Sequence, residues 1–106
     1  MDTPTRYKIL NLLEKDPTLS QRALADRLGL SLGKTNYCLK ALIEKGWVKV
    51  GNFRRSNRKI GYLYNLTPRG LAAKTRITRR FLKRKMDEHE RIKREIDELQ
   101  KEVKGN

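Results

Sequence analysis

The sequence predicts a mainly α-helical protein with one small β-hairpin, in the order three short helices, hairpin, long C-terminal helix. Three observations lead to this prediction. Apolar residues recur with a helical period over residues 5–45. The period then changes to two, which is typical of strands, over residues 47–66. From Pro68 to about Lys104, only Gly70 interrupts a polar sequence that favours helix.

Charge and size narrow the range of possible binding partners. The chain has 106 residues, with 26 Lys or Arg against 12 Asp or Glu, and a net charge of +14. This excess favours a polyanionic partner, nucleic acid before an anionic membrane surface. Residues 54–94 hold fifteen basic and three acidic side chains, so most of the positive charge lies there. A single cysteine permits no disulfide within the chain, and no signal peptide or membrane-spanning run is found, so we expect a cytoplasmic protein without membrane contact.

The first two helices are expected at residues 5–15 and 20–28. Thr5 is the expected N-cap of the first, which ends before Pro17 because the residue preceding a proline is disfavoured in a helix. Gly29 ends the second, since glycine enters the left-handed region at little cost. The apolar face of the first helix comprises Tyr7, Ile9, Leu10, Leu12 and Leu13.

The third helix is expected from about Ser31 to Lys45, with Ser31 as its N-cap and Gly46 after its end. Four residues on it are spaced as one buried stripe: Leu32, Thr35, Leu39 and Leu42. The other side is polar and carries two lysines and a tyrosine. A short helix, a glycine turn and a second helix with such a face are typical of a helix-turn-helix, in which the second helix reads DNA.

A hairpin is expected next, with a first strand that begins at residues 47–50 and a return strand at residues 60–66. Its turn carries four positive charges in six residues, which are Arg54, Arg55, Ser56, Asn57, Arg58 and Lys59, and all six are candidate DNA contacts. Three helices followed by such a hairpin form a winged helix, whose tip we expect to contact phosphates or a minor groove. A merely solvated loop is the alternative. It is less favoured because four like charges repel each other unless an anion is near.

The last element is a helix of about 35 residues, or about 50 Å, that begins at Pro68 after the N-cap Thr67. Its distal part has a heptad pattern, from which we expect a homodimer through this helix, and Glu88 and Lys93 are placed to suit a parallel coil. Packing back onto its own domain is the alternative. The expected dimer contacts are Leu82, His89, Ile92, Ile96, Leu99 and Val103. Residues 1–70 would then be the DNA-binding domain and residues 71–106 the dimerisation helix.

A resemblance to a known family emerges from these motifs. Residues 24–48, LADRLGLSLGKTNYCLKALIEKGWV, followed by a basic hairpin and LTPRG, resemble the winged helix-turn-helix of MarR-type bacterial transcriptional regulators. The resemblance covers residues 5 to about 72 and implies a DNA-binding regulator. The short chain with a long charged tail is similar to the small branch associated with exopolysaccharide (EPS) loci. Typical members dimerise through one N-terminal and two C-terminal helices, whereas this sequence predicts one long C-terminal helix.

The candidate DNA contacts lie on the polar side of the third helix. Lysine binds phosphate or guanine, asparagine can bond adenine at two points, and tyrosine can donate to phosphate or pack on a thymine methyl group. A plain solvated helix face is the alternative. The candidates are Ser31, Gly33, Lys34, Asn36, Tyr37 and Lys40.

Three further features keep more than one interpretation. A basic band on the long helix could bind flanking phosphates, bind another anion or only keep the helix soluble. For Cys38, a buried apolar role is favoured over a redox switch. For His89, a polar residue tolerated in the heptad pattern is favoured over a pH-sensitive contact. The band comprises Arg76, Arg79, Arg80, Lys83, Arg84 and Lys85.

The sequence as a whole predicts a homodimeric regulator that binds a palindromic operator in duplex DNA. A non-specific architectural DNA-binding protein and a protein-interaction module are the alternatives. An enzyme is not expected, because one histidine and one cysteine supply no self-contained zinc cluster and no glycine-rich phosphate loop is present. No cofactor or metal is expected, and no effector follows from the sequence.

Overall fold

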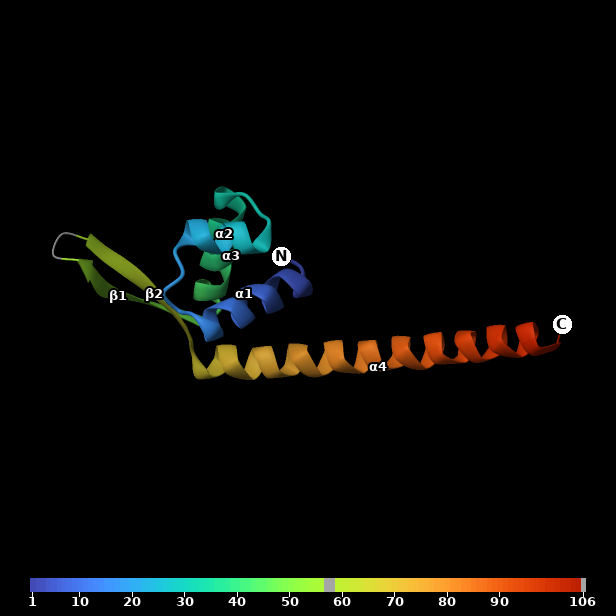
Figure 1. Ribbon diagram of the computed structural model, residues 1–106. Helices are drawn as coiled ribbons and strands as arrows, with labels where there is room; N and C mark the ends of the chain where they lie inside the picture. The colour runs from blue at the N-terminus through green and yellow to red at the C-terminus, as the bar shows by residue number, and fades with distance from the viewer. Residues whose placement is uncertain (57–58, 106) are drawn as a thin grey trace.

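The computed structural model describes residues 1–56 and 59–105 and confirms the predicted fold class (Figure 1). Three short helices form a head, a hairpin projects from one side of it, and a long helix runs beneath it and far beyond. The molecule is therefore elongated, with extents of 73 × 25 × 21 Å. The elements are α1 (Thr3–Lys15), α2 (Gln21–Leu28), α3 (Leu32–Glu44), β1 (Val48–Ser56), β2 (Lys59–Leu66) and α4 (Pro68–Gly105).

Helix α1 begins earlier than expected, because Asp2 rather than Thr5 is its N-cap. The Asp2 carboxylate accepts a hydrogen bond of 2.8 Å from the Thr5 backbone amide, so the predicted Thr5 cap is wrong. Hydrogen bonds from Thr5 also hold the pKa of Asp2 below its usual value. Asp16 ends the helix as expected, and its carboxylate accepts bonds from the amide and hydroxyl of Thr18.

The core lies where α1, α2 and α3 meet the base of the hairpin and the first turns of α4. Its fully buried large side chains are Ile9, Leu10, Leu13, Leu24, Thr35, Leu39 and Leu42. One member of the expected stripe on α3 is wrong: Leu32 is 43% exposed, since it is the first residue of the helix and lies outside the packed part. Cys38 is buried there instead, which agrees with its expected apolar role.

The hairpin is longer than the sequence predicted. The strands pair antiparallel from Val48 opposite Leu66 outward, and the backbone of much of the expected turn continues them. Tyr64 anchors the base: its backbone amide donates to the Pro17 carbonyl at 3.0 Å, and its hydroxyl accepts from the side-chain amide Nε2 of Gln21 at 3.2 Å.

The junction between hairpin and α4 is unusually tight. A Cβ built on Gly70 would lie 2.0 Å from the Trp47 carbonyl oxygen, so only glycine fits this position. The Thr67 amide donates to the same Trp47 oxygen at 3.0 Å, and the Thr67 hydroxyl donates to the Gly46 carbonyl. The Thr67 hydroxyl also accepts from the Gly70 amide at 3.1 Å, which confirms Thr67 as the N-cap of α4.

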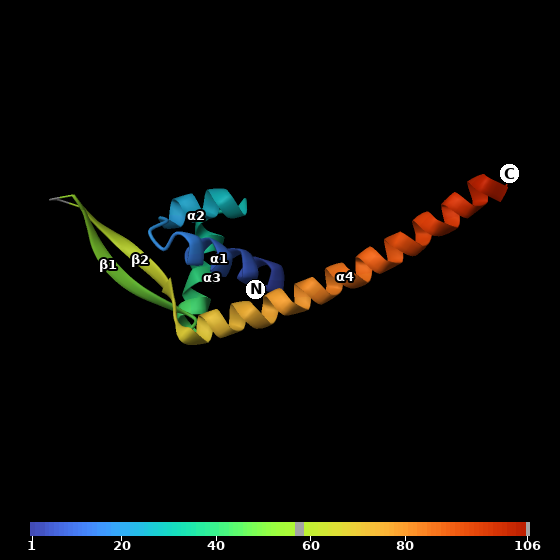
Figure 2. The same ribbon diagram turned by 60° about the horizontal axis from the view of Figure 1, so that its bottom comes forward.

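Helix α4 runs antiparallel to α1 over its first half and then extends alone (Figures 1 and 2). Ala73 and Ile77 are buried against the head. Lys74 pairs with Glu14 at 3.0 Å, and the ring of Phe81 meets the ring of Tyr7 edge-on at 5.2 Å between centroids. Beyond this contact every described residue of α4 except Glu88 is exposed, which leaves the distal half without cover from the head.

We predict that Gly70→Ala destabilises the fold by about 1–3 kcal/mol, because the added methyl group collides with backbone that cannot move away. Gly33→Ala is the matched control. A Cβ there meets nothing within 4 Å, so the loss of backbone entropy in the unfolded chain should stabilise the protein by about 0.5–1 kcal/mol. Urea denaturation at one protein concentration measures both. Equal stability of Gly70→Ala and the unchanged protein would contradict the tight junction.

Candidate nucleic-acid interface

Helix α3 presents one buried side and one open side. Thr35, Cys38, Leu39 and Leu42 hold the buried side in the core. All six residues predicted to contact DNA are exposed: Ser31, Gly33, Lys34, Asn36, Tyr37 and Lys40. Tyr37 is 70% exposed, which is high for an aromatic side chain on a folded domain. The structure thus gathers the predicted residues on one rigid helix without using their side chains, apart from Ser31, for packing or capping.

Ser31 confirms its predicted role as N-cap of α3. Its hydroxyl oxygen accepts a hydrogen bond of 3.1 Å from the Lys34 amide. A hydroxyl that accepts through oxygen keeps its own proton free to donate. The first turn of α3 therefore offers a hydroxyl donor beside the positive end of the helix dipole, which is where anions bind well.

The end of α3 is fixed as firmly as its start. Gly46 follows the helix with φ of 79°, in the left-handed region that favours glycine. The Trp47 amide then donates to the Leu42 carbonyl at 3.0 Å, closing the last turn. Because both ends and one side are fixed, the exposed side of α3 has a defined direction relative to the hairpin.

The predicted wing residues are only partly within the described structure. Asn57 and Arg58 lie outside the described residues. Arg54, Arg55, Ser56 and Lys59 belong to the outer ends of β1 and β2 rather than to a loop. The expected short turn over residues 54–59 is therefore corrected: strand pairing continues into it, with a shift in register between residues 54 and 56.

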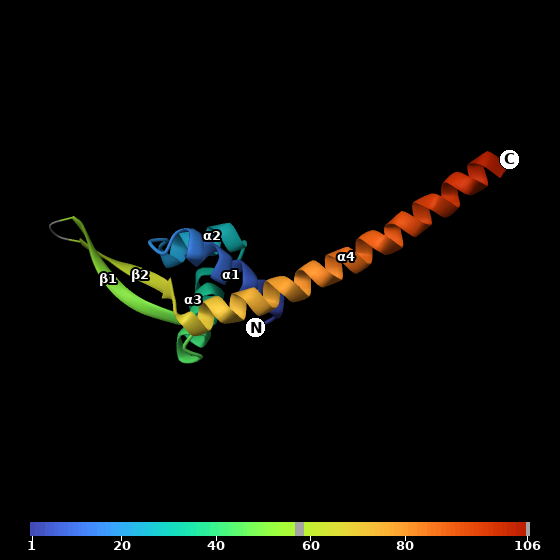
Figure 3. The ribbon, with the colours of Figure 1, turned by 90° about the horizontal axis from the view of Figure 1, so that it is seen from below.

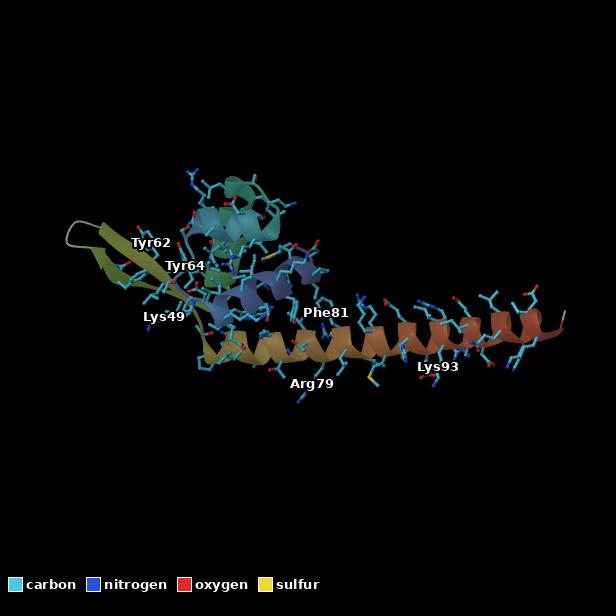
Figure 4. All side chains as sticks on the ribbon, viewed as in Figure 1. Lys49, Tyr62, Tyr64, Arg79, Phe81 and Lys93 are labelled. Carbon is cyan, nitrogen blue, oxygen red and sulfur yellow. The ribbon has the colours of Figure 1, made fainter. Side chains whose placement is uncertain are left out.

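Two exposed hairpin residues were missed from the sequence. Lys49 on β1 and Tyr62 on β2 are both exposed, and Tyr62 is 59% exposed with its ring stacked on Tyr64 at 6.2 Å (Figure 4). Period-two alternation could have indicated Lys49, because it follows the buried Val48. Tyr62 could not be found in this way, since it shares a strand face with the buried Tyr64.

The distal part of α4 exposes an unusual amount of apolar surface. Its large apolar side chains are between 49% and 77% exposed, and His89 is exposed among them. We call these six residues the seam: Leu82, His89, Ile92, Ile96, Leu99 and Val103. The expected alternative, that α4 folds back over its whole length onto its own domain, is wrong beyond Phe81. In the described ranges 1–56 and 59–105, no helix has the length and apolarity to cross a membrane.

A family model described as winged helix-turn-helix DNA-binding matches residues 2–49. No curated protein matches. Among solved structures, the PcaV transcriptional regulator from Streptomyces coelicolor in complex with its natural ligand is 26% identical, with a TM-score of 0.66. A MarR/EmrR family transcriptional regulator from Acinetobacter sp. ADP1 is 24% identical, with a TM-score of 0.65. Each alignment covers 78% of this chain and 57% of the other.

FabT from Streptococcus pneumoniae, solved in complex with DNA, has the same fold at 20% identity and a TM-score of 0.59, over 78% of this chain and 56% of its own. The chain thus spans just over half the length of these proteins. The comparisons confirm the resemblance to MarR-type regulators and the winged helix-turn-helix. The exopolysaccharide-associated branch stays a prediction.

Proposed function

We propose that this winged helix-turn-helix protein of the MarR type is a homodimeric transcriptional regulator that binds a palindromic operator in duplex DNA in the cytoplasm. The observation that carries the proposal is the open side of α3. Six residues suited to DNA contact lie there, on a helix held rigidly by its other side. Two such helices in one dimer would enter successive major grooves about 34–36 Å apart.

The residues of α3 take different roles in this proposal. Ser31 donates its free hydroxyl proton to a phosphate, and Lys34 and Lys40 contact phosphates or guanine. Asn36 bonds an adenine edge, and Tyr37 packs on a thymine methyl group or donates to phosphate. Sequence preference thus rests on side chains that the fold itself does not need.

Gly33 supports a close approach of α3 to DNA. Alanine would be the better helix former at this position, and the fold has room for it, since no atom lies within 4 Å of the Cβ position. A glycine that the fold does not require is explained if the first turn of α3 must come close to the DNA backbone or a base edge.

The hairpin supplies the wing in this proposal. Its strands extend away from the head, so the outer ends of β1 and β2 lie far from the base of the hairpin, where Tyr64 is anchored. We infer that these residues contact phosphates or the adjacent minor groove: Arg54, Arg55, Ser56, Asn57, Arg58 and Lys59.

The seam supports a dimer through α4, with residues 1–70 as the DNA-binding domain and 71–106 as the dimerisation helix. A second copy of the chain suits the seam, because its apolar residues recur at heptad spacing on a helix that its own head does not cover. Ile96 and Val103 fall at a positions and Leu99 at d, a combination that favours two parallel strands.

The charges beside the seam favour the parallel orientation as well. All three g positions over this stretch are acidic, at Glu88, Glu95 and Glu102, whereas Lys93 and Gln100 stand at e. Parallel pairing brings g to e and matches Glu88 with Lys93 of the second copy, whereas antiparallel pairing brings g to g and opposes glutamates. A parallel coil also places both heads at the same end, as a palindromic site requires.

We predict that the double variant Lys34→Ala, Tyr37→Ala lowers the ratio of operator affinity to random-DNA affinity at least tenfold, because it removes side chains that read bases. Lys104→Ala, at the far end of α4, removes the same charge and should leave the preference unchanged. Competition binding at fixed salt, on duplexes first selected from random sequence, measures the ratio. An unchanged ratio in the double variant would assign reading to another element.

Gly33→Ala should separate folding from binding. We predict a protein as stable as the unchanged one or more so, but with affinity for the selected operator reduced about tenfold, because the methyl group keeps α3 from the groove. Denaturation and competition binding on the same preparation measure the two effects. Full affinity in a stable Gly33→Ala protein would show that no close approach occurs at this residue.

Ile96→Lys with Leu99→Lys should give monomers by light scattering, because it places charges in the centre of the seam. Glu90→Gln with Glu98→Gln adds the same net charge on the other side of α4 and should remain dimeric.

Val103→Cys in a Cys38→Ala background should form a disulfide between copies under mild oxidation if the coil is parallel. A dimer that persists in the lysine variant would place the interface elsewhere, and one without the disulfide would be antiparallel.

A further inference from the structure

The structure divides the basic band on α4 into residues with different surroundings. Lys85 pairs with Glu88 at 3.3 Å, and the guanidinium of Arg84 lies over the ring of Phe81 at 5.8 Å. These contacts within α4 account for two of the six predicted band residues. Arg79 is also exposed, but it lies about 60° around the helix from Arg76 and points away from the head (Figure 4). The other three, Arg76, Arg80 and Lys83, are exposed and call for a separate explanation.

With Arg69 these three residues form what we call the basic stripe: Arg69, Arg76, Arg80 and Lys83. At 100° per residue, they fall within a sector of about 60° on α4 and span about 21 Å along it. All four are exposed, and within the described part of the chain none makes an ion pair. No carboxylate occurs on α4 before Asp87, so nothing on this stretch of the helix neutralises the stripe.

The stripe and the seam lie on opposite sides of α4. Ile92 and Ile96 lie about 160° around the helix from Arg76, and Val103 about 180°. A partner bound along the seam therefore leaves the stripe open to solvent. The stripe borders the side of α4 that packs on the head: the buried Ala73 lies about 20° from Arg80, whereas Ile77 lies about 100° from Arg76. All four residues of the stripe nevertheless remain exposed.

The stripe starts beside the end of the reading helix. The Nη1 atom of Arg69 lies 3.6 Å from the position that a Cβ on Gly46 would occupy, and Gly46 closes the last turn of α3. Figure 3 shows the C-terminal end of α3 emerging next to the first turns of α4. A ligand in contact with α3 could thus reach the stripe without leaving the protein surface.

We propose that the basic stripe binds the phosphate backbone of the duplex flanking each half-site, outside the bases that α3 reads. The proposal rests on the proposed function, since it assumes that α3 lies on DNA. Arginine suits this role because its guanidinium donates two parallel hydrogen bonds to one phosphate. Clustering four cations without a carboxylate costs self-repulsion, and a line of phosphates relieves it.

The test uses a variant in which all four residues of the stripe become glutamine: Arg69→Gln, Arg76→Gln, Arg80→Gln and Lys83→Gln. Binding is measured over a range of salt concentrations, on a selected operator with and without ten extra base pairs on each side. Each lost phosphate contact should lower the magnitude of the slope of log K against log salt by about 0.9. Because the dimer carries two stripes of four cations, the slope of the stripe variant should fall by about 7 on the long duplex. On the short duplex the change should be much smaller.

A second variant provides the control for net charge: Arg91→Gln, Arg94→Gln, Lys101→Gln and Lys104→Gln. These residues lie on the distal half of α4, off the a, d, e and g positions, and lose the same charge. Its slope should change by less than 1 on either duplex. Equal slopes for the two variants on the long duplex would contradict the stripe as a flanking contact. An equal loss of slope by the stripe variant on the long and short duplexes would contradict it as well.

The same data separate this proposal from the one it rests on. Because phosphate contacts carry no sequence information, the ratio of operator to random affinity should be unchanged in the stripe variant. If the unchanged protein binds the operator no more tightly than random DNA, the proposed function fails, whatever the stripe does. If the stripe variant keeps its slope on DNA but alone loses binding to vesicles of anionic phospholipid, the surface binds membrane and the stripe proposal is wrong.

Discussion

The contact of Gly70 with the Trp47 carbonyl oxygen is the constraint on which the arrangement of the molecule depends. Three elements meet there: the end of α3, the first residues of β1 and the start of α4. Thr67 ties the same point together through bonds to the backbone of Gly46 and Trp47. Because no side chain fits between Gly70 and the Trp47 backbone, the direction of α4 relative to α3 is set by backbone contact rather than by adaptable packing.

This junction explains how a small core supports a long helix. The buried part of α4 reaches only as far as Ile77, and the contact of Phe81 with Tyr7 completes the packing on α1. Helix α4 carries exposed apolar side chains along its distal part, and the basic stripe lies on the opposite side, nearer the N-terminal end of the helix. Because the helix is fixed at that end by backbone contact, both surfaces keep a defined direction relative to the head.

Much of the fold was predictable because local chemistry decided it. Ser31, Gly29 and Gly46 mark helix ends through hydrogen bonds and backbone angles within a few residues, and all three behave as expected. The misjudged positions are those at which the local pattern allowed two outcomes. At the start of α1 the choice was itself local, because the Asp2 carboxylate accepts from the Thr5 amide three residues further on. Packing left Leu32 outside the core, and strand pairing carried the hairpin past its expected turn.

The sequence by itself determined the element order, the polar side of α3, the heptad spacing on α4 and the strong positive charge, because each depends on residue type and short-range periodicity. Only the tertiary structure decided which basic residues are free. Lys74 lies on the same helix as the stripe, yet it pairs with Glu14 of α1 at 3.0 Å, while Arg69, Arg76, Arg80 and Lys83 remain on an open side. The reason is geometric: a helix turns 100° per residue, so adjacent charges face different surroundings, and only the packing of α4 on the head shows what those surroundings are.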